Sequence, residues 1–231
     1  MIRGSTASRR RQRAARQSVV QALEPRLLLC ADDGFSDPVP GMLPATGTAI
    51  IQPAASTGTL YPLTAVPALN SDPGAPATLY LDFHGEAGQT WGFQDVPATP
   101  AYDIDGDPTT FSAQELTNIQ QIWAAVAEAY SPFNVNVTTV DPGTWSTGGQ
   151  HQFRDVIGGN GSWTGVAEGG TAYVRSYSDS SLPDTAYVFS TNLGNDPTYT
   201  AIDAVHEAGH GFGLQHQSLY SGTAKTNEYN P

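Results

Sequence analysis

The sequence of 231 residues contains one cysteine, Cys30, and two methionines, Met1 and Met42. A single cysteine excludes an intramolecular disulfide and a zinc site built from several cysteines. Basic residues are also scarce, since 10 Lys+Arg stand against 22 Asp+Glu and give a formal net charge of −12. This acidic balance argues against nucleic acid as a partner. No apolar run reaches the roughly 18 residues that a membrane span requires, so we expect no transmembrane segment.

The few basic residues are concentrated at the N-terminus. Seven of the ten lie within the first 30 residues, where Glu24 is the only acid, whereas 3 basic residues stand against 21 acidic ones from residue 31 onward. A Sec-type signal needs an unbroken apolar stretch after its basic region, and here residues 24–26 (Glu-Pro-Arg) interrupt it. Residues 23–29 resemble the LEPR-x-L-L segment found near the N-termini of many planctomycete surface and secreted proteins. The resemblance implies that residues 1–31 direct export or surface display; a disordered basic tail is the alternative.

Residues 32–75 have the composition of a linker or prosegment. Eight prolines lie between Pro38 and Pro76, and no charged residue occurs from Pro38 through Ser71. Such a segment cannot build a core of its own. We therefore place a single folded domain at residues 76–231.

The folded part alternates predicted strands with two predicted helices. The capping box of Ser112 and Glu115 opens the first helix, and apolar residues at three- and four-residue intervals continue to just before Pro132. An Asp-Pro pair opens the second helix, at residues 196–211. Strand-forming runs predict strands at residues 78–83, 133–140, 171–174 and 186–190. The strand–helix–strand order predicts a right-handed crossover between parallel strands, and hence an α/β fold.

The second predicted helix and the residues just after it contain three of the five histidines of the chain. His206 and His210 are one helical turn apart and present both imidazoles to one point, as two ligands of one zinc ion must. His216 reaches that point only if the chain turns after the helix. Gly213 stands where the turn is required, because glycine adopts the left-handed conformation without steric cost. Three imidazoles leave one tetrahedral position open, as in catalytic zinc sites.

Glu207 follows the first of these histidines and would border the metal without binding it. A carboxylate in this place can accept a proton from a zinc-activated water and pass it to a leaving nitrogen. The competing interpretation is a core helix with incidental histidines.

His206, Glu207, His210, Gly213 and His216 form the string H-E-x-x-H-x-x-G-x-x-H, which resembles the signature of the metzincin zinc endopeptidases. The order of predicted elements from residue 77 to residue 216 also resembles the N-terminal subdomain of that family. The resemblance implies an α+β catalytic subdomain with a long helix, a mixed sheet with an antiparallel edge strand, and an active-site helix. It implies Zn²⁺ as the cofactor and a protein or peptide as the substrate. It further implies that residues 186–190 form the edge strand along which an extended peptide lies.

Two features depart from the metzincin pattern. That family has a methionine turn downstream of the third histidine, but no methionine follows Met42. We therefore expect a chain that is incomplete at its C-terminus; loss of the pocket floor is the alternative. Gln217 follows the third histidine, where the known subfamilies carry Glu, Asp, Pro or Ser/Thr, so the subfamily stays open.

Other residues offer rival or supporting metal contacts. Glu228 is an alternative third ligand, as a downstream glutamate is in thermolysin-like enzymes. Cys30 could cap the zinc from a prosegment, as a thiolate does in matrixins. Asp203, one turn before His206, either orients the imidazole of His206 or is a solvated residue on the helix surface.

Asp103, Asp105 and Asp107 precede the first predicted helix in an alternating pattern that could bind Ca²⁺. The pattern departs from an EF-hand, because Pro108 takes the place of the glycine and Gln114 that of the bidentate glutamate. A solvated acidic turn ahead of a capped helix is the alternative.

Taken together, these features predict a secreted or surface-displayed zinc endopeptidase. His206, His210 and His216 would bind the zinc, and Glu207 would act as general base and acid. The alternative from another class is a non-catalytic, zinc-stabilised extracellular adhesion or interaction module.

Overall fold

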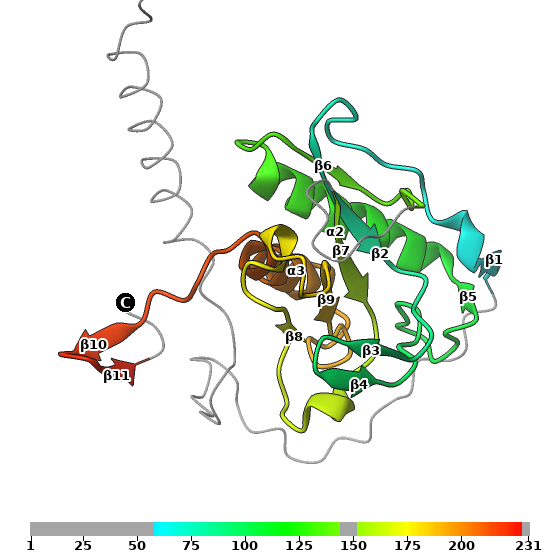
Figure 1. Ribbon diagram of the computed structural model, residues 1–231. Helices are drawn as coiled ribbons and strands as arrows, with labels where there is room; N and C mark the ends of the chain where they lie inside the picture. The colour runs from blue at the N-terminus through cyan, green and yellow to red at the C-terminus, as the bar shows by residue number, and fades with distance from the viewer. Residues whose placement is uncertain (1–57, 144–151, 228–231) are drawn as a thin grey trace, which may run out of the picture. The chain divides into compact units, whose positions relative to one another are not determined.

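The computed structural model describes residues 58–143 and 152–227 (Figure 1). The chain divides into two compact units after Leu214. The described residues of the smaller unit form a hairpin of β10 (Leu219–Ser221) and β11 (Ala224–Asn227). The predicted targeting segment, residues 32–57 of the predicted linker, Cys30 and Glu228 all lie outside the described residues.

A five-stranded mixed sheet in the order β6-β2-β7-β9-β8 forms the centre of the larger unit (Figure 1). β2 (Ala77–Asp82) pairs in parallel with β6 (Val135–Thr138) and with β7 (Gln152–Ile157). β7 also pairs in parallel with β9 (Thr185–Val188). β8 (Gly170–Thr171) completes one edge, antiparallel to β9. The predicted α/β fold with a mixed sheet and an antiparallel edge strand is thereby confirmed.

The predicted position of the edge strand is wrong. Residues 186–190 were expected at the edge, but this segment belongs to β9, which lies between β7 and β8 and is buried along its whole length. An apolar run of this kind is typical of a strand that is covered on both faces. The central strand β7 is absent from the predicted strands, because Arg154 and Asp155 interrupt its apolar pattern.

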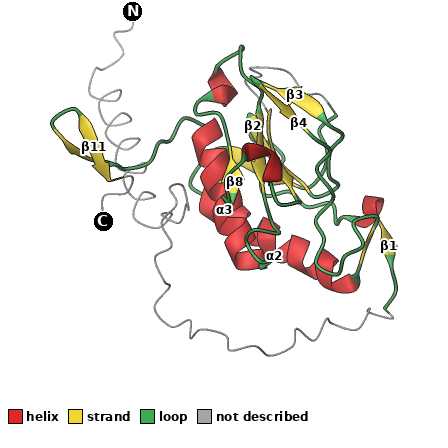
Figure 2. Cartoon of the chain, turned by 90° about the horizontal axis from the view of Figure 1, so that it is seen from below, coloured by secondary structure: helices red, strands yellow, loops and turns green. Residues whose placement is uncertain are grey.

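The two helices α2 (Ala113–Tyr130) and α3 (Pro197–Gly211) lie side by side on one face of the sheet (Figures 1 and 2). α2 begins with the predicted capping box, in which Ser112 and Glu115 bond reciprocally. Asp196 caps α3 by accepting hydrogen bonds from two backbone N–H groups of its first turn. Within the described residues, neither helix has the apolar length of a membrane span.

α3 approaches β7 closely because the side of the helix that faces the sheet carries small residues. Gly211 lies so near Phe153 that a Cβ at this position would stand within 3 Å of the ring. Small side chains at three- and four-residue intervals form one continuous helix face. The alanines of that face are at most 2% exposed and are Ala201, Ala204 and Ala208.

The hairpin of β3 (Gln89–Trp91) and β4 (Gln94–Val96) packs against the other face of the sheet. Val156 contacts this hairpin, whereas Phe153, three residues earlier on β7, faces the helices, because side chains alternate along a strand. The buried cluster that joins hairpin and sheet consists of Trp91, Val96, Val156, Tyr187 and Phe189. Trp163 and Tyr173 pack against this cluster.

The end of the predicted linker is bonded to the sheet. The backbone N–H of Ser71 donates to Val137 O at 3.0 Å, and that of Thr139 donates to Leu69 O at 3.1 Å. Further towards the N-terminus, β1 (Tyr61–Pro62) pairs with β5 (Thr110–Phe111) in antiparallel fashion. These residues therefore pack as part of the folded unit.

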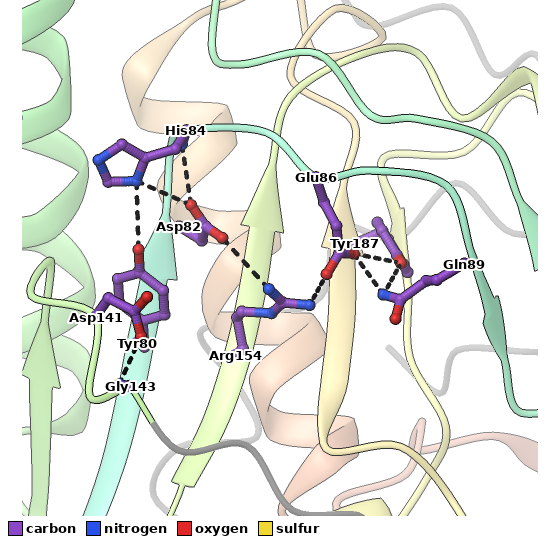
Figure 3. A network of polar contacts seen from close by, with 9 residues as sticks. All are labelled: Tyr80, Asp82, His84, Glu86, Gln89, Asp141, Gly143, Arg154 and Tyr187. Atoms are coloured by element: carbon purple, nitrogen blue, oxygen red, sulfur yellow. Dashed lines mark hydrogen bonds and ion pairs between the residues drawn. The ribbon is translucent and has the colours of Figure 1, made fainter. Parts of the chain in front are cut away.

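A polar network lies on the hairpin side of the sheet (Figure 3). Arg154 forms ion pairs with Glu86 and, at 3.6 Å, with Asp82. The Tyr187 hydroxyl donates to Glu86 at 2.8 Å, and His84 bonds to Asp82 through its backbone N–H and its Nδ1, each at 3.0 Å. The three charged side chains are 13% exposed or less. One guanidinium thus pairs with two carboxylates in a region that is nearly closed to water.

Replacement of Arg154 by methionine should destabilise the fold strongly. It would leave Asp82 and Glu86 as buried carboxylates without their cation, and we expect the free energy of unfolding to fall by about 3–5 kcal/mol. Urea unfolding of parent and variant measures the difference. Arg175→Met, at an exposed arginine, is the control and should change stability by about 0.5 kcal/mol or less. Equal stability of Arg154→Met and the parent would contradict the role of this network.

Candidate metal centre

The three histidines of the predicted zinc site come together. His206, His210 and His216 each offer a ring nitrogen, and these nitrogens all lie within 4.8 Å of one another. The rings of His206 and His210 stand perpendicular, with centroids 4.4 Å apart. All three residues are half-buried. The cluster could hold a metal ion.

The position of this cluster follows from the packing of α3. His206 and His210 each come two residues after a buried alanine of the sheet-facing side, which places them about 200° around the helix axis. Their imidazoles are therefore on the side of α3 that faces away from the sheet. The small residues pack one face of α3 against the sheet, and the two histidines therefore lie on its opposite face.

The end of α3 has the turn that the sequence predicts. Gly213 adopts a left-handed φ of 102°. Its N–H donates to His210 O at 2.8 Å, and the N–H of Leu214 donates to Gly209 O at 2.9 Å. This pair of bonds is a Schellman motif, which satisfies the last carbonyls of a helix and reverses the chain. The role predicted for Gly213 is confirmed.

The same turn orients one of the predicted ligands. His210 Nδ1 lies 2.9 Å from Leu214 O. Because a carbonyl oxygen only accepts hydrogen bonds, Nδ1 carries the proton, and Nε2 holds the lone pair of the neutral ring. A histidine that binds a metal commonly donates its other ring N–H in this way. The residues therefore fit a metal ligand at Nε2 of His210.

Glu207 lies on a different flank of α3 from the two histidines. It is 2% exposed, and its Cγ lies close to Gly170 of the edge strand β8. Arg175, shortly after β8, donates its backbone N–H to His210 O at 2.8 Å. The edge strand and the segment that follows it are thus in contact with α3, the helix that carries two of the three clustered histidines.

Asp203 is buried, at 2% exposure, and its Oδ2 has no hydrogen-bond partner among the described residues. This burial contradicts the interpretation of Asp203 as a solvated surface residue. Burial, with a smaller contribution from Glu168, raises the pKa of Asp203 to about 7. Asp155 of β7 is fully buried, and its pKa is also raised, by burial and then by the charge of Asp203. A lone aspartate within a strand belongs to no motif, so Asp155 was not among the predicted site residues.

The acidic loop before α2 brings together a set of carboxylates that differs from the predicted one. Ligand atoms of Asp103, Asp105 and Glu115 lie within 4.8 Å of one another. Asp107 instead accepts hydrogen bonds from the two threonines that follow Pro108. Both oxygens of Glu115 accept hydrogen bonds from the surrounding loop. Calcium binding at this loop stays a prediction.

Comparisons of the chain with protein families, with curated proteins and with solved structures found no match. The inference of a metal centre therefore rests on the geometry of the three histidines. Three imidazole nitrogens are a donor set that suits zinc, copper, iron and nickel. Glu207, which follows His206 in the sequence, is a carboxylate that can exchange protons.

The buried carboxyl group of Asp203 should make stability depend on pH. Its pKa of about 7 in the folded chain exceeds the ordinary value, so the folded state binds more protons than the unfolded state between these values. The stability that this group contributes is complete at low pH and is lost as the pH rises from about 4 to about 7. Chemical unfolding at about pH 5 and about pH 8 should show a larger loss of stability in the parent than in Asp203→Asn. Equal losses would contradict the raised pKa.

Proposed function

We propose that the chain is a zinc-dependent endopeptidase of metzincin type. The observation that carries the proposal is the convergence of three histidine nitrogens within 4.8 Å, with Glu207 adjacent in sequence to the first histidine. A core helix with incidental histidines gives no reason for His216, which lies beyond the end of the helix, to join the other two. Three imidazoles with one open coordination position are typical of a zinc ion that takes part in hydrolysis.

The residues divide the chemistry between them. Zinc, when bound, supplies a Lewis acid that activates water and polarises the scissile carbonyl group. Glu207 accepts the proton of the attacking water and delivers it to the leaving nitrogen. The stem of this side chain is held against β8, so that its carboxylate loses little conformational freedom when it acts.

The substrate in this proposal is an extended protein or peptide segment. β8 pairs with β9 along one edge, and no strand among the described residues pairs with its other edge. A peptide can add to an open strand edge through main-chain hydrogen bonds. The substrate would therefore lie along residues 170–171 rather than along residues 186–190.

The proposed location is extracellular or at the cell surface. It is supported by the resemblance of residues 23–29 to the planctomycete segment and by the acidic composition of the rest of the chain. The competing proposal, a non-catalytic zinc-stabilised interaction module, shares the metal cluster but has no role for Glu207. Zinc binding without peptide hydrolysis in the parent chain would favour the module.

Metal analysis tests the ligand set before any substrate is known. We expect elemental mass spectrometry to find about one zinc per purified chain, and much less in His216→Ala, because two imidazoles bind zinc weakly. His84→Ala, which changes a histidine that bonds to Asp82, is the control and should keep its zinc. Equal zinc in His216→Ala and the parent would contradict the third ligand and direct attention to Glu228.

Removal of the carboxylate should separate catalysis from metal binding. We expect Glu207→Ala to keep its zinc and to lose peptide hydrolysis by about 10²–10⁴-fold, the usual contribution of a general base. His210→Ala should lose both zinc and activity. Glu128→Ala, at an exposed glutamate of α2, is the matched control and should retain both. Unchanged hydrolysis by Glu207→Ala would overturn the proposed mechanism.

A further inference from the structure

Two glycines at the start of the edge strand pack directly against α3. Gly170 pairs with Val188 of β9, and Gly169 O accepts a hydrogen bond from the N–H of Phe189 at 2.6 Å. Neither glycine has a positive φ, so their backbone conformations are open to any residue. The requirement for glycine here is therefore one of space.

The space is taken by the two acidic side chains of α3. A Cβ at Gly170 would stand 2.7 Å from the Cγ of Glu207 and closer still to Asp203 Oδ2. A Cβ at Gly169 would stand 2.5 Å from Asp203 Oδ1 and would also crowd Leu193, and none of its three nearest atoms belongs to Glu207. Both glycines thus lie against Asp203, and Gly170 also lies directly against Glu207.

The Gly170 contact leaves Glu207 little room to move. Its side chain is 2% exposed and lies between its own helix and a strand whose backbone is hydrogen-bonded to β9. The backbone carbonyl oxygen of Tyr187 would also stand 2.7 Å from a Cβ at Gly170. A methyl group at Gly170 would therefore meet the backbone of β9 as well as two side chains, and the side chains of Asp203 and Glu207 must give way.

We propose that Gly170 is a positioning residue for Glu207. Because Gly170 has no side chain, the Cγ of Glu207 packs directly against the backbone of the edge strand, and this contact fixes the position of the carboxylate. This inference rests on the proposed function for its effect on hydrolysis, but the contact itself is independent of any activity. The same two-residue strand would hold the substrate backbone, so Gly170 sets the distance between the base and the bound peptide.

The contact is tested by a double-mutant cycle of thermal stability. Gly170→Ala should lower the midpoint of thermal unfolding by about 5 °C, as overpacking does. In a Glu207→Ala background the Cγ is gone but Asp203 Oδ2 and Tyr187 O remain, so the same change should lower the midpoint by a smaller amount than in the parent. Gly169→Ala should cost the same in both backgrounds. Equal effects of Gly170→Ala in both backgrounds would overturn the proposal.

The catalytic consequence is tested by kinetics of the zinc-loaded chain. Gly170→Ala should keep about one zinc and a KM close to that of the parent, while kcat falls about 10²-fold, the effect of a misplacement of about 1 Å. Gly74→Ala is the control, because a Cβ there meets only Asp72 Oδ1, at 3.8 Å. A loss of kcat in Gly169→Ala as large as in Gly170→Ala would overturn the specific role of Gly170.

The two experiments separate this inference from the proposed function. A parent chain that binds zinc but hydrolyses no peptide would refute the proposed function. Coupling of Gly170 to Glu207 in the thermal cycle would still support the packing contact between these two residues. An active parent without that coupling would refute only the positioning role of Gly170.

Discussion

The close packing of α3 on β7 is the contact on which the rest of the candidate site depends. Alanines and Gly211 on one face of the helix allow the backbone of α3 to approach the sheet. Once this face is packed against the sheet, the helical repeat determines the direction in which every other side chain of α3 points. His206 and His210 face away from the sheet, whereas Asp203 and Glu207 lie on the flank towards β8. A single packing surface thus orders the metal cluster, the carboxylates and the edge strand together.

The sheet buries charge on both faces and neutralises it in two ways. On the hairpin side, Arg154 pairs with Asp82 and Glu86, so the cost of removing three charges from water is offset by their mutual attraction. On the helix side, Asp155 and Asp203 have no such cation among the described residues, and burial raises their pKa. Burial there favours the neutral form of each carboxyl group, whereas on the other face a guanidinium compensates the negative charge. Neighbouring residues of β7 therefore differ: Arg154 is charged and paired with carboxylates, whereas burial raises the pKa of Asp155.

Elements with local signals were predicted well from the sequence. The capping box at Ser112, the Asp196 cap and the glycine turn at Gly213 each depend on a few adjacent residues, and the structure confirms all three. The strands fared worse. β7 was missed because Arg154 and Asp155 interrupt its apolar pattern, and Arg154 is paired with residues far away in the chain. The edge strand was misplaced because strand order depends on pairing rather than on composition.

What the sequence by itself determined is the helical part of the candidate site: the spacing of His206 and His210 places both on one side of α3, because a helix repeats every 3.6 residues. Tertiary structure decided whatever depends on contacts between distant residues. It placed Glu115 rather than Asp107 with Asp103 and Asp105, made β8 the edge strand, and set Gly170 against Glu207. The reason is physical, because periodicity acts over a few residues, whereas packing joins segments that a sequence pattern does not relate.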